Sequence, residues 1–201
     1  MRTATPGDSP AAGPSSHGLL EAGELCAALR LGPGQVLVDA GCGPGGHALD
    51  AAAAVGPAGA VYALDVDVRL LRDLARAAAD RGLDRVQALA ADITARIPLP
   101  DACADACLAA TVLHMPRVSR ALGAVFGELR RILKPGGRLA VLECDPEAWG
   151  GGPAGSRRRR EGELAAAACG LAPGPVREHG LVFLMLFEKR ETPPSSGRAG
   201  S

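Results

Sequence analysis

A carboxylate stands directly before a glycine-rich turn at residues 39–46, which read DAGCGPGG. An apolar run precedes this segment and an alanine-rich stretch follows it, an order that predicts a strand, a turn and a helix. Glycines let the backbone approach a ligand closely, and the first turn of a helix offers free N–H groups and a positive dipole end. A dinucleotide would place its pyrophosphate here, where Asp39 would repel it. Asp39 therefore favours a ligand with a positive end, such as an amino acid or a sulfonium.

Two further acids follow the next apolar run. Asp65 ends the run at residues 61–64, and Asp67 lies two residues beyond it. An acid at the tip of a strand can accept both hydroxyls of a ribose, and a dehydrogenase uses an acid at a similar spacing. Aspartate is also favoured as the cap of a helix. We therefore expect Asp65 to bind a nucleoside and Asp67 to cap the following helix.

The glycine turn fits the pattern Asp/Glu-x-Gly-x-Gly-x-Gly, and residues 129–139 (LRRILKPGGRL) form a second recognisable segment. Together with residues 61–65, 90–93 and 104–114, five such segments occur in order over residues 35–144. The chain resembles the class I S-adenosylmethionine-dependent methyltransferases, and most of all the small-molecule branch (methyltransferase type 11) that includes the quinone-biosynthesis enzymes. The turn alone is only moderately specific, since its glycines also fit Gly-x-Gly-x-x-Gly.

The resemblance implies an S-adenosylmethionine cofactor and a small molecule as methyl acceptor. It places the methionyl end of the cofactor on Asp39 and the glycine turn, the ribose on Asp65 and the adenine amino group on Asp92. Val66 and Ile93 would form apolar walls for the adenine ring. No metal is expected. The expected cofactor-binding residues are Asp39, Gly41, Cys42, Gly43, Gly45, Asp65, Val66, Asp92, Ile93 and Ala109.

His114 is the candidate catalytic residue, because it follows the fourth expected strand at the edge of the sheet where ligands bind. Its imidazole could take a proton from a hydroxyl, thiol or amine, or it could simply pack or cap locally. No base is needed if the acceptor is a thiolate, a carbanion or an amine. Residues 143–145 end the fifth strand, where they could hold a substrate or form a polar exit from the strand. His47 could contact the cofactor or lie exposed in the first turn of its helix.

Two other groups of residues have a structural and a functional interpretation. The basic run at residues 157–160 is expected to be a solvated helix start, and the alternative is a contact with an acidic substrate or partner protein. The six cysteines contain no Cys-x-x-Cys pair. They are expected to be mostly buried free thiols, with a soft-metal or arsenical site as the minor alternative.

Composition limits the classes of protein to consider. The chain has 201 residues, of which 47% are hydrophobic, and its formal net charge is zero. This length fits one domain, and the charge argues against a general nucleic-acid binder. No apolar run approaches the ~18 residues of a membrane span, and the N-terminus lacks the apolar core of a signal peptide. We expect a cytoplasmic domain at residues 17–190, with disordered segments at 1–16 and 191–201. The oligomeric state is left open.

Strands and helices are expected to alternate, which predicts a mostly parallel sheet with helices on both faces. The apolar run at 181–187 predicts a central strand, which the resemblance implies is antiparallel. The expected fold is a three-layer, Rossmann-like α/β domain with a seven-stranded sheet containing one antiparallel strand near the C-terminus. The expected strands are 35–39, 60–65, 85–90, 104–110, 138–144, 173–180 and 181–189, and the expected helices are 18–31, 45–55, 67–81, 118–133 and 158–169.

Two other functions remain open from the sequence. A nicotinamide-dependent oxidoreductase would need a catalytic Tyr-Lys or Ser-Tyr set, but the only tyrosine, Tyr62, lies inside the second expected strand. A non-catalytic, methyltransferase-like binding subunit would keep the fold without the reaction. The complete set of acids argues against this second alternative.

Overall fold

A computed structural model describes residues 16–20, 22–148, 155–168 and 170–190. They form a seven-stranded sheet in the order β3-β2-β1-β4-β5-β7-β6. The first five strands are parallel to one another, and β7 is antiparallel to both β5 and β6. This is the expected fold class. The strands are β1 (Val36–Ala40), β2 (Ala60–Asp65), β3 (Val86–Ala90), β4 (Ala104–Ala110), β5 (Leu133–Cys144), β6 (Ala172–His179) and β7 (Val182–Glu188).

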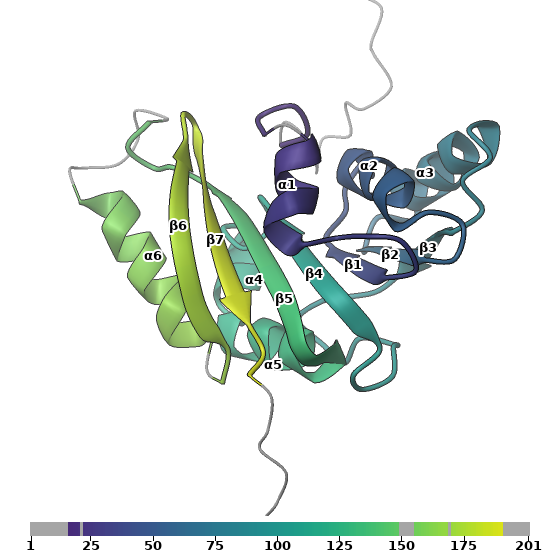
Figure 1. The fold of residues 1–201 in the computed structure, drawn as a ribbon. Helices are drawn as coiled ribbons and strands as arrows, with labels where there is room; N and C mark the ends of the chain where they lie inside the picture. The colour runs from purple at the N-terminus through teal and green to yellow at the C-terminus, as the bar shows by residue number, and fades with distance from the viewer. Residues whose placement is uncertain (1–15, 21, 149–154, 169, 191–201) are drawn as a thin grey trace, which may run out of the picture.

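Helices cover both faces of the sheet and make a three-layer domain (Figure 1). One face carries the first three helices, and the other carries the last three. The helices are α1 (Ala22–Leu29), α2 (Gly46–Val55), α3 (Val68–Asp80), α4 (Pro116–Ser119), α5 (Leu122–Ile132) and α6 (Ser156–Ala167).

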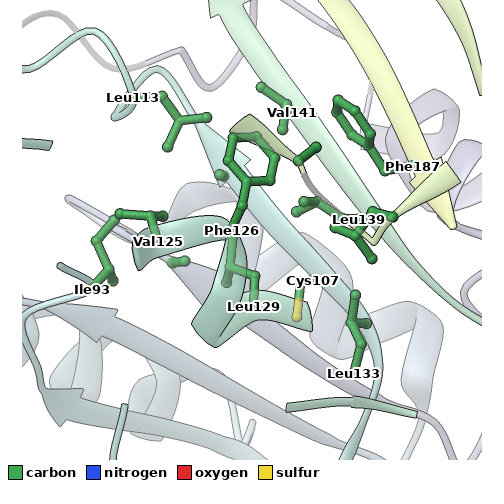
Figure 2. Packing of buried hydrophobic residues seen from close by; sticks show 14 of the residues in the cluster. Ile93, Cys107, Leu113, Val125, Phe126, Leu129, Leu133, Leu139, Val141 and Phe187 are labelled. Carbon is green, nitrogen blue, oxygen red and sulfur yellow. The ribbon is translucent and has the colours of Figure 1, made fainter. Parts of the chain in front are cut away.

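Each face of the sheet has its own hydrophobic core, because successive strand residues point to opposite sides. On the α5 face, Phe126 packs edge-to-face on Phe187 of β7, with ring centroids 5.6 Å apart (Figure 2). Leu113, which directly precedes His114, is fully buried in the same core. The strand β7 lies between β5 and β6 and is buried over most of its length, so the prediction of a central strand is confirmed.

Two expected boundaries are wrong. The single helix expected at residues 118–133 is two helices, because Pro116 begins α4 early and the chain turns at residues 120–121 before α5. Proline is favoured in the first turn of a helix, so its place marks the true start. The strand expected at 138–144 already begins at Leu133, which pairs with Ala104 before a register shift. The Pro-Gly-Gly segment therefore lies within an irregular strand.

The segment between β3 and β4, residues 91–103, is a loop that Arg131 of α5 holds in place. Its guanidinium donates to the carbonyls of Ile97 and Leu99, both at 2.9 Å, and to the carboxylate of Asp101 at 2.7 Å. It also bonds Glu128, one turn earlier on the same helix, at 2.7 Å. Ile97 itself is 1% exposed, so this loop contributes a side chain to the hydrophobic core even though it contains no helix.

None of the helices within the described residues combines the length and the apolar character needed to cross a membrane.

Candidate active site

A cleft of about 550 Å³ opens at the carboxyl ends of the parallel strands. Ligands bind at this edge in open α/β sheets, where the strand order reverses. The walls come from the end of β1, the turn into α2, the end of β2, the β3–β4 loop and the segments after β4 and β5. The expected site residues that line it are Asp39, Gly41, Cys42, Gly43, Asp65, Val66, Asp92, Ile93 and His114.

Two expected site residues lie outside the lining of the cleft. Ala109 is fully buried within β4, and its neighbour Ala110 lines the cleft instead. Gly45 supports the turn from behind: its φ is +81°, and a Cβ there would lie 2.3 Å from Cδ1 of Leu74. Gly45 is therefore required for the close packing of the turn on α3.

Asp39 is a buried acid with an unpartnered oxygen. Its side chain is 1% exposed, and its Oδ2 has no hydrogen-bond partner in the part of the chain that the structure describes. Burial, together with the nearby charge of Asp65, raises the pKa of Asp39 to about 7. A buried carboxylate oxygen without a partner is costly, so this site favours a ligand that supplies a donor or a positive charge.

Gly41 is also constrained by the space around it. Its φ is +79°, and a Cβ built on it would lie 2.5 Å from Cγ2 of Val112, a cleft residue. The N–H groups of Gly41 and Cys42 both donate to the carbonyl of Leu64 at 2.8 Å. The turn is thereby fixed to the end of β2, next to Asp65.

Asp65 and Asp67 have different partners. Asp65 accepts hydrogen bonds from the N–H groups of Gly43 and Asp67, each at 2.9 Å. Asp67 is the N-cap of α3 and accepts from the N–H of Arg69 at 2.9 Å, so its capping role is confirmed. The hydrogen bonds and charge of Arg69 lower the pKa of Asp67.

The cleft also combines the acid Asp92 with the exposed apolar side chain of Val66. Asp92 accepts from the N–H and the hydroxyl of Thr94, at 3.0 and 2.7 Å, and forms an ion pair with Arg117. These bonds to Thr94 are the main cause of a lowered pKa at Asp92. Val66 lines the same cleft and is 68% exposed, although valine is usually buried. A flat apolar group against Val66 would remove this surface from water.

His114 and Glu143 meet across the ends of β4 and β5. Nδ1 of His114 lies 2.6 Å from Oε1 of Glu143, whose side chain is 1% exposed. The same carboxylate accepts from the N–H of Cys144 at 3.0 Å and lies 3.4 Å from the guanidinium of Arg160. The hydrogen bond to Glu143 raises the pKa of His114. His114, Glu143 and Cys144 offer ligand atoms within 4.8 Å of one another, a group that could also hold a metal ion.

His47 is not exposed, which corrects one of the two expectations for it. It is 8% exposed, lines the cleft and lies 3.2 Å from the hydroxyl of Ser16. Burial lowers its pKa to about 4. Ser16, the last residue of the segment expected to be disordered, is 4% exposed. The rest of that segment and residues 191–201 lie outside the described residues.

Sequence reasoning also missed the apolar lining and one strained residue. Thr111 has a φ of +49°, which is unusual for a β-branched residue, and its N–H donates to the carbonyl of Leu142 at 2.7 Å. Nothing in the sequence marks it as left-handed. The other cleft residues that were not singled out are Ser16, Leu19, Pro44, Leu70, Ala91, Val112, Met115, Arg117 and Val118.

The basic run at the start of α6 is not simply solvated. Arg157 pairs with Glu178 at 2.7 Å and with Asp145 at 3.5 Å, and Arg160 pairs with Glu143 and Glu163. These two arginines therefore fix α6 to carboxylates of the sheet. The described cysteines are free, but only Cys107 is fully buried, and the other four are half-buried. Cys169 lies outside the described residues.

The sequence matches the family model described as a methyltransferase domain over residues 31–170. That match covers well over half of the chain. The chain belongs to this methyltransferase domain family. The resemblance noted in the sequence is thereby confirmed.

Relatives of this methyltransferase domain agree with that assignment. The ubiquinone/menaquinone biosynthesis C-methyltransferase UbiE of Bordetella avium is 37% identical over 55% of the chain, which covers 41% of that protein. Nocamycin O-methyltransferase of Saccharothrix syringae is 33% identical over 60% of the chain and 43% of its own length. The methyltransferase domain thus spans less than half the length of these curated relatives.

The solved structure of a SAM-dependent methyltransferase from Aquifex aeolicus is also similar. It superposes with a TM-score of 0.74 at 27% identity, and the alignment covers 88% of this chain and 94% of that one. The similarity extends over the sheet and its helices, so the fold of the methyltransferase domain is confirmed.

Proposed function

We propose that this domain transfers a methyl group from S-adenosylmethionine to a small-molecule acceptor. The observation that carries the proposal is Asp39, which is buried at the glycine turn with an oxygen that lacks a partner. A positively charged ligand end would give this carboxylate the counter-charge that the described chain does not supply. Family membership supports the same assignment.

The cofactor would lie along the cleft in three parts. Asp39 and the glycine turn would hold its methionyl end, and the carboxylate of Asp65 would accept the ribose hydroxyls. Asp92 would accept the adenine amino group while Val66 and Ile93 contact the ring. Cys42 and Gly43 would line the path between these parts, since both face the cleft.

The sulfonium of the bound cofactor supplies an activated methyl group. What remains for the chain is to hold the acceptor in line at about 3 Å and to exclude water. The apolar side chains of Leu19, Val112 and Met115 line the cleft and suit this second task. They also favour an acceptor that is itself largely apolar.

A calorimetric titration tests the cofactor assignment. The protein should bind S-adenosylmethionine and S-adenosylhomocysteine in the micromolar range, about −8 kcal/mol. It should not bind NADH, because the pyrophosphate would face Asp39. Release of S-adenosylhomocysteine from a small-molecule extract would then show turnover. Binding of NADH in place of S-adenosylmethionine would refute the proposal, and cofactor binding without turnover on any extract would indicate a non-catalytic subunit.

The division of roles between Asp65 and Asp67 gives a separate prediction. Asp65→Ala should weaken S-adenosylmethionine binding by about 10- to 100-fold, as for lost charge-assisted hydrogen bonds. Asp67→Ala should lower the melting temperature through loss of the helix cap but leave the affinity within about twofold. Calorimetry and thermal melts of both variants distinguish these effects. An equal loss of affinity in the two variants would contradict the assignment.

A further inference from the structure

In the pair formed by His114 and Glu143, the carboxylate holds the imidazole in one orientation, as expected for a general base. Leu113 is fully buried beside it, so the backbone at His114 is held by the core while the imidazole lines the cleft. The carboxylate behind the ring comes from the neighbouring strand, β5, and is almost completely buried. The two side chains are 29 residues apart in the sequence, so only the pairing of β4 with β5 brings them together.

The buried carboxylate is satisfied by donors on both of its oxygens. Oε1 accepts from Nδ1 of His114 and from the N–H of Cys144, and Oε2 lies 3.4 Å from Arg160. Charge-assisted bonds of this kind offset the cost of burying an ion. A neutral imidazole that donates from Nδ1 keeps its lone pair on Nε2. Nε2 is therefore the nitrogen available to a bound acceptor.

We infer that Glu143 positions His114 as a general base for an apolar acceptor whose reacting atom is a hydroxyl of phenolic or enolic type. This inference rests on the proposed methyl transfer. As the oxygen forms its bond to the methyl group, its proton passes to Nε2 of His114. The electron pair of the broken sulfur–methyl bond stays on sulfur and leaves a neutral thioether. The imidazolium is stabilised by Glu143 until its proton is lost to solvent.

The chemistry explains why the acceptor belongs to this class. A phenol has a pKa near 10 and is mostly protonated at neutral pH, so it benefits from a base. A thiolate or a neutral amine is already nucleophilic and needs none. The hydrogen bond that His114 donates to Glu143 raises the pKa of His114 above its ordinary value of 6.5, which makes the ring a stronger base. Cys144 and Arg160 are the other titratable or charged groups next to the His114–Glu143 pair. The rest of the same cleft carries Asp39, His47, Asp65, Asp67, Asp92 and Arg117.

The first test needs no acceptor. In protein loaded with S-adenosylhomocysteine, ¹⁵N NMR should show the neutral His114 ring protonated on Nδ1, with a pKa above 6.5. Glu143→Gln should lower that pKa, because it removes the negative charge. Glu163→Gln is the matched control: Glu163 is the other carboxylate on Arg160, is half-exposed and lies outside the cleft. An Nε2-protonated ring, or the same pKa in wild type and Glu143→Gln, would overturn the inference.

The second test uses naphthol, naphthalenethiol and naphthylamine with S-adenosylmethionine, read out as S-adenosylhomocysteine release. Naphthol should be methylated at a rate that rises with pH through the pKa of His114. His114→Ala should slow it about 10²-fold, the lower end for general-base catalysis. Glu143→Gln should slow it and shift the rise to lower pH, whereas Glu163→Gln should do neither. All variants should bind the cofactor with affinities within about twofold of wild type.

The outcomes separate this inference from the proposed function. Failure of the wild type to bind S-adenosylmethionine would refute the proposed function itself. Cofactor binding with transfer only to the thiol or amine, or to none of the three compounds, would overturn the hydroxyl class alone. Stimulation of the rate by added zinc, or its loss in EDTA, would assign the cluster to a metal ion instead of a base.

Discussion

Replacing Gly41 by alanine is expected to destabilise the domain by about 2–5 kcal/mol, more than the same change at Gly43. A left-handed backbone costs alanine about 1–2 kcal/mol. The new Cβ would also lie 2.5 Å from Cγ2 of Val112, and overpacking of this kind costs about 1–3 kcal/mol. Thermal or denaturant unfolding of the variant measures the sum.

Gly43 provides the matched control within the same turn. Its φ is also positive, +54°, but a Cβ there would have no neighbour within 4 Å. Gly43→Ala should therefore lose only the backbone part, about 1–2 kcal/mol. Adding Val112→Ala to Gly41→Ala should recover the part of the stability that is lost to the steric clash. A double-mutant cycle isolates the interaction between residues 41 and 112. Equal losses in Gly41→Ala and Gly43→Ala would show that Val112 moves aside at no cost.

Asp39→Ala is expected to weaken S-adenosylmethionine binding by about 10- to 100-fold, or about 1–3 kcal/mol. The same acid should be a burden on the free protein, because its carboxylate is buried and lacks a partner on Oδ2. The isosteric Asp39→Asn should therefore bind the cofactor more weakly and yet melt at a higher temperature at pH 8. A parallel fall in affinity and melting temperature would indicate that Asp39 is only structural.

The pKa of Asp39 predicts how both quantities depend on pH. Its pKa is about 7 in the folded protein, against an ordinary value of 3.8. Between these values the folded state holds a proton that the unfolded chain has lost. The contribution of Asp39 to stability therefore falls as pH rises toward 7 and is constant above it. Affinity for a cationic ligand should instead rise through pH 7, and Asp39→Asn should remove both dependences in melts and calorimetry.

The arrangement of the strands was predictable because it depends on local patterns. Apolar runs that end in an acid, such as the one before Asp65, mark strands whose carboxyl ends must meet at one edge of a parallel sheet. The continuous apolar run at residues 181–187 placed β7 in the interior of the sheet for the same reason. The break between α4 and α5 was missed because the apolar spacing continues across residues 120–121, although the backbone turns there.

The candidate site was predictable only in its backbone-determined part. The positions of Asp39 and the glycines are set by a turn that allows few backbone conformations. The pairs His114–Glu143 and Arg117–Asp92 depend instead on side-chain rotamers and on residues distant in the sequence. The half-buried cysteines and the inward-facing Arg157 and Arg160 were misjudged for a related reason. Residue type gives only the average environment of a side chain, and for the two arginines ion pairs with particular carboxylates override that average.

Arg131 has a consequence for the thermodynamics of ligand binding. It lies outside the cleft, yet it holds the loop that carries Asp92 and Ile93 through the carbonyls of Ile97 and Leu99. The loop is thus already ordered before a ligand arrives. The conformational entropy of the loop is already lost when the chain folds. Ordering the loop therefore adds no entropy cost to ligand binding at the proposed adenine end. The guanidinium of Arg131 therefore preorganises the proposed adenine-binding surface although it does not line the cleft.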